Sequence, residues 1–119
     1  MDTLISLERA VLLAIADQVP AIAEALISQL AEVVVSDREN TGAGFYTTLS
    51  VSAGQPIVGV SSPVGDIGAK VESVEHGMGF LLWLSDNFMC RIEGYTYADN
   101  TEHLDLERLT FSEIGPRRV

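Results

Sequence analysis

The side chains in this chain that could do chemistry are few, and most of them lie in one acidic segment. Two tyrosines alternate there with carboxylates, in the set Glu93, Tyr95, Tyr97, Asp99, Glu102, Asp105 and Glu107. Paired carboxylates can perform acid–base chemistry inside a pocket. Tyrosines beside carboxylates are equally typical of a protein-binding surface, where aromatic side chains supply contact area and acids supply orientation. An ordinary solvated loop is the third interpretation. Our leading hypothesis is a binding surface that includes the first six of these residues.

The two histidines offer weaker candidates. A metal site would need His76 and His103 to be joined by carboxylates, and the spacing of a metal-ligand pair is absent, so we predict neither a metal site nor a cofactor. His76 stands beside a glycine, where a histidine is typically a hydrogen-bonded structural residue. The alternative hypothesis is a small-molecule-binding protein or a modest hydrolase. Its pocket would lie between helices and sheet and use His76, Glu93 and Tyr95.

Two Gly-x-Gly-Phe motifs, at residues 42–45 and 77–80, resemble phosphate-binding loops at first sight. A dinucleotide-binding loop needs a third glycine and a following helix, and a P-loop needs a lysine. Both motifs instead lead into apolar, strand-like runs, so we interpret each as a loop that enters a strand, with a bulge or close backbone packing. Cys90 alternates with Phe88 and Ile92, which predicts a buried and unreactive thiol.

Composition limits the classes of function. The chain has 119 residues, 47% of them hydrophobic, and a net charge of −10 from 17 acidic and 7 basic side chains. Such a charge repels phosphate backbones and anionic membranes, and no apolar run is long enough to span a bilayer, so we predict neither nucleic-acid nor membrane binding. The N-terminal residues lack the pattern of a signal peptide, and one cysteine forms no internal disulfide, so we expect a cytoplasmic protein. The acidic surface either serves solubility or attracts a basic protein partner.

Helical periodicity marks the N-terminal part, residues 4–31. Apolar residues recur at helical spacing, first around Leu7 and Val11 and then around Leu26 and Leu30. Pro20 separates the two sets. Since proline suits the first turn of a helix and disrupts its interior, we expect two helices or one helix sharply kinked at Pro20.

Residues 32–114 are β-rich. The run Phe80–Leu84 is apolar on both faces, which predicts a central strand, and Ser85–Asn87 predicts a tight hairpin turn. We further expect a polar turn over Asp37–Gly42, a last strand over Leu104–Phe111 and a short tail over residues 115–119. Together these elements predict one α+β domain over residues 1–119, with the helical segment packed on an antiparallel sheet of about five strands. Leu81 and Trp83 then need a cover on the second sheet face, from the first helix or from a second subunit in a homodimer.

Three segments carry a resemblance to known proteins: residues 38–46, residues 76–83 and residues 93–97. Over residues 20–100 the chain resembles a group of small, acidic, uncharacterised bacterial proteins of one domain, in which a helical segment precedes a similar series of strands. By size and charge the chain is also similar to immunity proteins, which neutralise basic toxins with an acidic face. This resemblance implies a binding role for the chain and assigns no catalytic residue.

Overall fold

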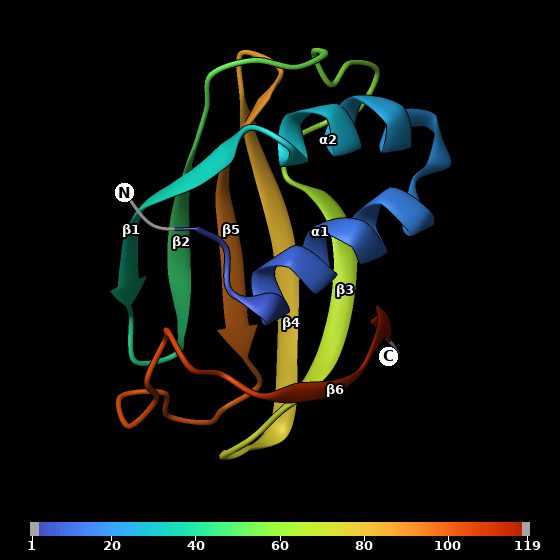
Figure 1. Cartoon of the computed structure of the whole chain (residues 1–119). Coiled ribbons are helices and arrows are strands. Elements are labelled where there is room, and N and C mark those ends of the chain that lie inside the picture. Colours follow the sequence, from blue (N-terminus) through green and yellow to red (C-terminus); the bar gives the residue numbers. More distant parts are fainter. Residues whose placement is uncertain (1–2, 118–119) are drawn as a thin grey trace.

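The computed structural model describes residues 3–117 and consists of two helices followed by a six-stranded antiparallel sheet (Figure 1). The helices are α1 (Ser6–Gln18) and α2 (Ala23–Leu30), with the 3-10 turn η1 (Pro20–Ile22) between them. The strands are β1 (Val33–Asn40), β2 (Gly44–Val51), β3 (Val64–Val71), β4 (Val74–Ser85), β5 (Phe88–Thr96) and β6 (Phe111–Pro116). Their order across the sheet is β1-β2-β5-β4-β3-β6. The predicted α+β fold is confirmed, with six strands in place of about five.

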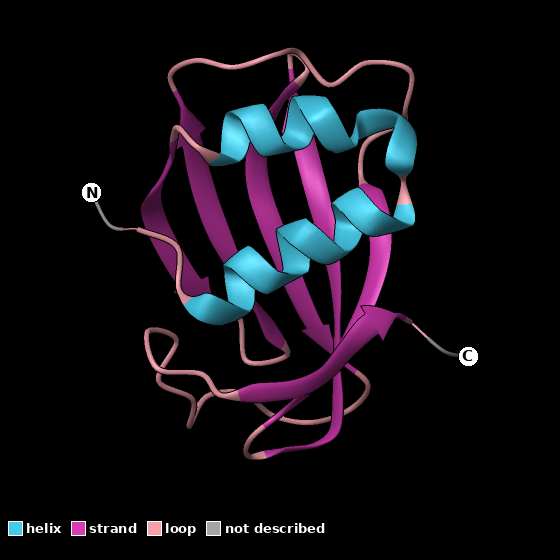
Figure 2. Cartoon of the chain, turned by 45° about the vertical axis from the view of Figure 1, so that its right-hand side comes forward, coloured by secondary structure: helices cyan, strands magenta, loops and turns pink. Residues whose placement is uncertain are grey.

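Both helices pack on the same face of the sheet (Figure 2). Pro20 is the first residue of η1, where its missing N–H is no loss, and the chain bends there by 112°. The N-terminal segment is therefore two helices. Their apolar stripes and the inner face of the sheet form one core, whose fully buried side chains include Leu7, Val11, Ile15, Leu26, Phe45, Phe80, Leu82 and Ile92.

The hairpin of β4 and β5 forms as predicted. β4 lies between β5 and β3, so the run Phe80–Leu84 is in the interior of the sheet. Asp86 and Asn87 connect the strands with φ of 51° and 69°, which is the left-handed backbone that a two-residue hairpin turn requires. Cys90 lies in a bulge opposite Trp83 and Leu84, so the simple alternation through Phe88 and Ile92 is interrupted.

Three predicted boundaries are wrong. β1 continues through residues 37–40, where a polar turn was predicted, because an edge strand can direct polar side chains to solvent while its backbone pairs with β2. Residues 104–110 form turns, and the last strand begins only at Phe111. Gly115 and Pro116 belong to this strand and pair with β3, while residues 118 and 119 of the predicted tail lie outside the described residues.

The two Gly-x-Gly-Phe motifs lie on either side of β5. Gly44 begins β2, but Gly77 and Gly79 lie inside β4, so the second motif is not a loop that enters a strand. On the helix-covered face, Phe45 and Phe80 meet edge to face, with ring centroids 6.2 Å apart. They meet over Gly94 of β5, where a Cβ atom would lie 2.9 Å from Phe45 and 3.0 Å from Phe80. The repeated Phe therefore fills the core on both sides of one glycine.

A buried ion pair joins α1 to the sheet. Glu8 is 1% exposed and accepts hydrogen bonds from Arg38 of β1, at 2.8 and 2.9 Å, and from the Thr47 hydroxyl of β2, at 2.6 Å. It also accepts the backbone N–H of Ile5, just before α1, at 2.8 Å. Every charge-bearing oxygen thus has a partner, as a buried carboxylate requires.

Candidate functional site

The second face of the sheet is not covered by the helices, and it carries aromatic and charged side chains. Glu93 and Tyr95 alternate with the buried Ile92 and Gly94, so they point to this open face. Trp83 lies there as well and donates its indole N–H to Glu93 at 2.9 Å. The helix-facing side of the sheet is filled by the hydrophobic core. The residues of the alternative pocket therefore do not lie between helices and sheet.

Tyr95 lies across a row of glycines on the open face. Gly44 and Gly79 are its neighbours in the adjacent strands, and Gly68 continues the row into β3. A Cβ atom on Gly79 would lie 2.2 Å from Cζ of the Tyr95 ring. The glycine row thus provides the space in which the ring lies flat against the sheet. Burial of the phenol raises the pKa of Tyr95 above its usual value, although nearby Arg117 opposes this effect.

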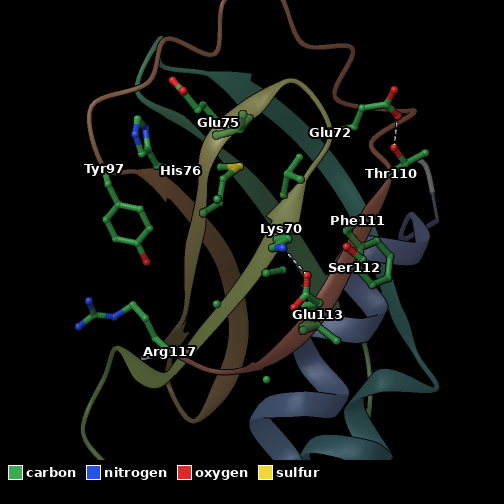
Figure 3. Close-up of a pocket in the computed structure, with 18 of the residues that line it drawn as sticks. Lys70, Glu72, Glu75, His76, Tyr97, Thr110, Phe111, Ser112, Glu113 and Arg117 are labelled. Atoms are coloured by element: carbon green, nitrogen blue, oxygen red, sulfur yellow. Dashed lines mark hydrogen bonds and ion pairs between the residues drawn. The ribbon is translucent and has the colours of Figure 1, made fainter. Parts of the chain in front are cut away.

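Tyr97 extends this aromatic pair to the edge of a groove. Its ring meets that of Tyr95 edge to face, with centroids 5.8 Å apart, and 43% of the residue is exposed. The groove has a volume of about 1120 Å³ and is formed by β3, the beginning of β4 and β6. Figure 3 shows Tyr97, His76 and Arg117 along one side, and Lys70 and Glu113 on the other. Among the six residues of the predicted binding surface, Tyr97 is therefore the one that lines this groove, and His76 of the alternative pocket lines it as well.

The two strong cations of the groove are already paired. Lys70 forms an exposed ion pair with Glu113 at 2.6 Å, and Arg117 donates to Asp66 of β3 at 2.7 Å. The hydrogen bonds to these carboxylates raise the pKa of both Lys70 and Arg117, so both remain charged. By contrast, the ion pairs found among the described residues include neither Glu72 nor Glu75. The Glu72 carboxylate accepts a hydrogen bond from the Thr110 hydroxyl.

The acidic loop, residues 97–110, is fixed beside the groove by a buried threonine. Thr101 is fully buried; its hydroxyl donates to Asn40 Oδ1 at 2.9 Å and accepts the Gly44 N–H at 3.0 Å. Its backbone N–H donates to the Gly42 carbonyl at 2.9 Å. These bonds hold the acidic loop against the β1–β2 turn. A threonine in a polar loop gave no signal in the sequence that it would have this role.

The remaining acidic candidates occupy separate positions on this loop. Asp99 reaches across to His76 of β4, and Glu102 lies beside Gly42 of the β1–β2 turn. Asp105 accepts the backbone N–H of Glu107 at 3.1 Å and lies 3.8 Å from Arg108. The six candidates therefore lie on one end of the sheet and its open face, but they do not converge on one point as a catalytic set would.

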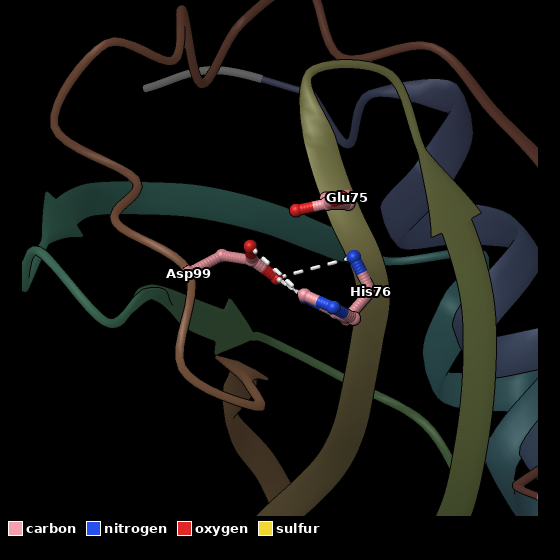
Figure 4. Close-up of side chains that lie close together, drawn as sticks. All are labelled: Glu75, His76 and Asp99. Carbon is pink, nitrogen blue, oxygen red and sulfur yellow. Dashed lines mark hydrogen bonds and ion pairs between the residues drawn. The ribbon is translucent and has the colours of Figure 1, made fainter.

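One cluster has the composition of a metal site. Glu75, His76 and Asp99 place one ligand atom each within 4.8 Å of one another (Figure 4). Residue spacing did not predict this cluster, since Asp99 lies 23 residues from His76 and comes from a different element. Cys90 is not part of any such cluster; its thiol donates to the Trp83 carbonyl at 3.4 Å, and burial raises its pKa. That shift favours the protonated, unreactive thiol.

Comparison with models of protein families, with curated proteins and with solved structures finds no match to this chain. Within residues 3–117, no single helix is long and apolar enough to cross a membrane; α1 and the η1–α2 segment reach that length and composition only as a pair bent by 112°.

Proposed function

We propose that this chain is a non-catalytic cytoplasmic protein-interaction domain that binds a basic segment of a partner protein. The observation that carries the proposal is the position of the acidic loop beside the groove. The fold brings the exposed Tyr97 ring to the groove, and it brings Glu72 and Glu75 to the same groove from the β3–β4 hairpin. An immunity-like or regulatory binder would present this combination of features.

Charge complementarity identifies the occupant as basic. Glu72 and Glu75 line the groove, and the acidic loop beside it carries Asp99, Glu102, Asp105 and Glu107. Arg108 is the one arginine or lysine of the acidic loop, and Lys70 and Arg117, which line the groove, are each paired with a carboxylate. The resulting negative field steers a lysine- or arginine-rich segment into the groove.

Tyr97 would supply the main contact area. A partially exposed aromatic ring beside carboxylates can receive the side chain of a partner's arginine on its face. Contact with Tyr95 holds the ring in place before binding, so little conformational freedom is lost when the partner arrives. Aromatic residues of this kind are often the ones on which affinity depends most.

The test separates this site from general attraction to an acidic protein. A fluorescent lysine- and arginine-rich peptide is titrated with the wild type, with the double variant Glu72→Lys, Glu75→Lys in the groove, and with the control Glu24→Lys, Glu32→Lys. Both double variants have the same net charge, and the control changes exposed residues of α2 and the α2–β1 connection. We expect the groove variant to weaken binding about tenfold more than the control. Equal weakening by both variants would falsify the proposal.

The uncharged change Tyr97→Ala gives an independent test. We expect it to weaken peptide binding about fivefold or more, with the salt dependence retained, because the aromatic contact is lost while the field remains. Affinity capture from lysate of the native organism at two salt concentrations would then identify the partner. A basic protein that the wild type retains and Tyr97→Ala does not is the expected result.

A further inference from the structure

We propose that Glu75, His76 and Asp99 form a binding site for a divalent transition metal such as Zn²⁺ at the edge of the groove. Nδ1 of His76 lies 3.2 Å from both carboxylate oxygens of Asp99. Two ligands at about 2.0–2.1 Å from one tetrahedral zinc ion are about 3.3 Å apart, so this pair already has the spacing of two ligands on one ion. Glu75 brings a third oxygen within 4.8 Å, on an exposed side chain that can turn toward the other two.

Asp99 is held in position before any metal arrives. Its side chain is 16% exposed, and Oδ2 accepts the backbone N–H of His76 at 3.2 Å. Its own carbonyl accepts the Thr96 hydroxyl at 2.8 Å. Figure 4 shows the carboxylate directed from the acidic loop toward the imidazole on β4. Hydrogen bonds that orient a ligating carboxylate strengthen a metal site, since less freedom is lost on binding.

The ligand types indicate which metals would bind. An imidazole nitrogen with two carboxylates suits zinc and similar transition ions, whereas Ca²⁺ and Mg²⁺ prefer sites built from oxygen alone. The His76 side chain is 60% exposed, so a bound ion would keep positions open to water. The acidic character of the loop that carries Asp99 raises the local concentration of cations.

The test uses the full chain, stripped of metal by a chelator and titrated with Zn²⁺ by calorimetry. We expect one zinc ion to bind, with affinity about tenfold lower in His76→Gln. The matched control is His103→Gln. This second histidine contacts the Ser73 carbonyl through Nε2 and lies outside the cluster, so its loss should leave the affinity unchanged.

A third variant excludes an indirect effect through folding. Glu75 is exposed, so Glu75→Gln should keep the thermal unfolding midpoint of the metal-free protein and still weaken zinc binding about tenfold. Zinc should also shift the NMR signals of the His76 ring and leave those of His103 in place. Binding that is equal in all variants, or no binding at millimolar zinc, would show that the cluster is only a His–Asp ion pair and would overturn the proposal.

Discussion

At the centre of the sheet, glycines lie beneath aromatic rings on both faces. Over Gly94, two phenylalanines fill the helix-covered face, and over Gly79 the Tyr95 ring lies on the open face. Gly94 and Gly79 therefore each accommodate a ring of a neighbouring strand, whereas Gly44 allows close approach of the β5 backbone. This arrangement explains the repeated Gly-x-Gly-Phe motif by packing, without phosphate chemistry.

Adding a methyl group along the glycine row should destabilise the fold to different extents. At Gly44 a Cβ would lie 2.0 Å from a backbone oxygen of Gly94, and φ is +141°; at Gly79 it would meet only the end of the Tyr95 ring. We expect Gly79→Ala to cost about 1–3 kcal/mol and Gly44→Ala to cost more. Urea denaturation measures both. Tyr95→Ala should rescue Gly79→Ala alone, and Gly115→Ala, which meets nothing within 4 Å, is the neutral control.

The raised pKa of Tyr95 makes stability depend on pH in the alkaline range. Burial favours the neutral phenol in the folded state. Its contribution to the free energy of unfolding is therefore fully present below the ordinary tyrosine pKa of about 10. It is lost as pH rises through the higher folded value. Phenolate absorbance is titrated with pH in the wild type and in Tyr95→Phe. The variant should lack one phenol that, in the wild type, ionises above a pH of about 10. Loss of a phenol that ionises at or below that pH would contradict the assignment.

Among the elements, buried polar side chains as well as the apolar core connect the helices to the sheet and its loops. Glu8 connects α1 to β1 and β2, and Gln29 connects α2 to the loops at the opposite end. Gln29 is fully buried; it donates to the carbonyls of Gln55 and Asn87 and accepts the N–H of Met89. These directional hydrogen bonds define the position of each helix on the sheet. Apolar packing alone would define that position less well.

Removing the buried carboxylate should be costly. Glu8→Ala removes the buried carboxylate to which Arg38 and Thr47 donate, so we expect a loss of about 3–5 kcal/mol in the free energy of unfolding. Chemical denaturation measures it, and Glu32→Ala, an exposed change, should stay within about 0.5 kcal/mol. Replacing both charges, as Glu8→Met with Arg38→Met, should recover much of the loss. A cost below about 1 kcal/mol for Glu8→Ala would contradict a structural role for the pair.

At the scale of the whole molecule, the two sheet faces differ in what they contact. The helices cover one face, so the first helix is not the cover that Leu81 and Trp83 were expected to need. Arg91 and Glu93 lie beside them with opposite charges, an arrangement in which two copies related by a two-fold axis can pair their charges. The homodimer thus stays a prediction, now assigned to the open face.

Sedimentation equilibrium tests this assembly. We expect a dimer for the wild type and a monomer for Trp83→Lys, because the new charge would be buried in the interface. The matched control is Ile27→Lys, at a position 50% exposed on α2, which should remain dimeric. A wild-type chain that is monomeric at all concentrations would show that the open face does not form a homodimer.

The features predicted correctly are those decided by neighbours in the sequence. The 3.6-residue period around Leu7 and Leu26, the apolar run of β4 and the Asp86–Asn87 turn each follow from local backbone and side-chain preferences. The polar end of β1 was missed because local propensity favours a turn there, and only pairing with β2 makes it a strand. Composition was enough to predict Tyr97 and the acidic loop as candidates. The groove beside them was not predicted, because it depends on how β3, β4 and β6 pack together.

The sequence by itself determined the α+β class, an N-terminal helical segment interrupted at Pro20, the central hairpin and the acidic character of the chain. Only the tertiary structure decided that Asp99 meets His76, that Glu8 meets Arg38 and that Tyr95 lies between two glycines. The physical reason is sequence separation. Periodicity and turn chemistry act between near neighbours, while these contacts depend on strand register and on where a loop is pinned, both of which are set by packing of the whole sheet.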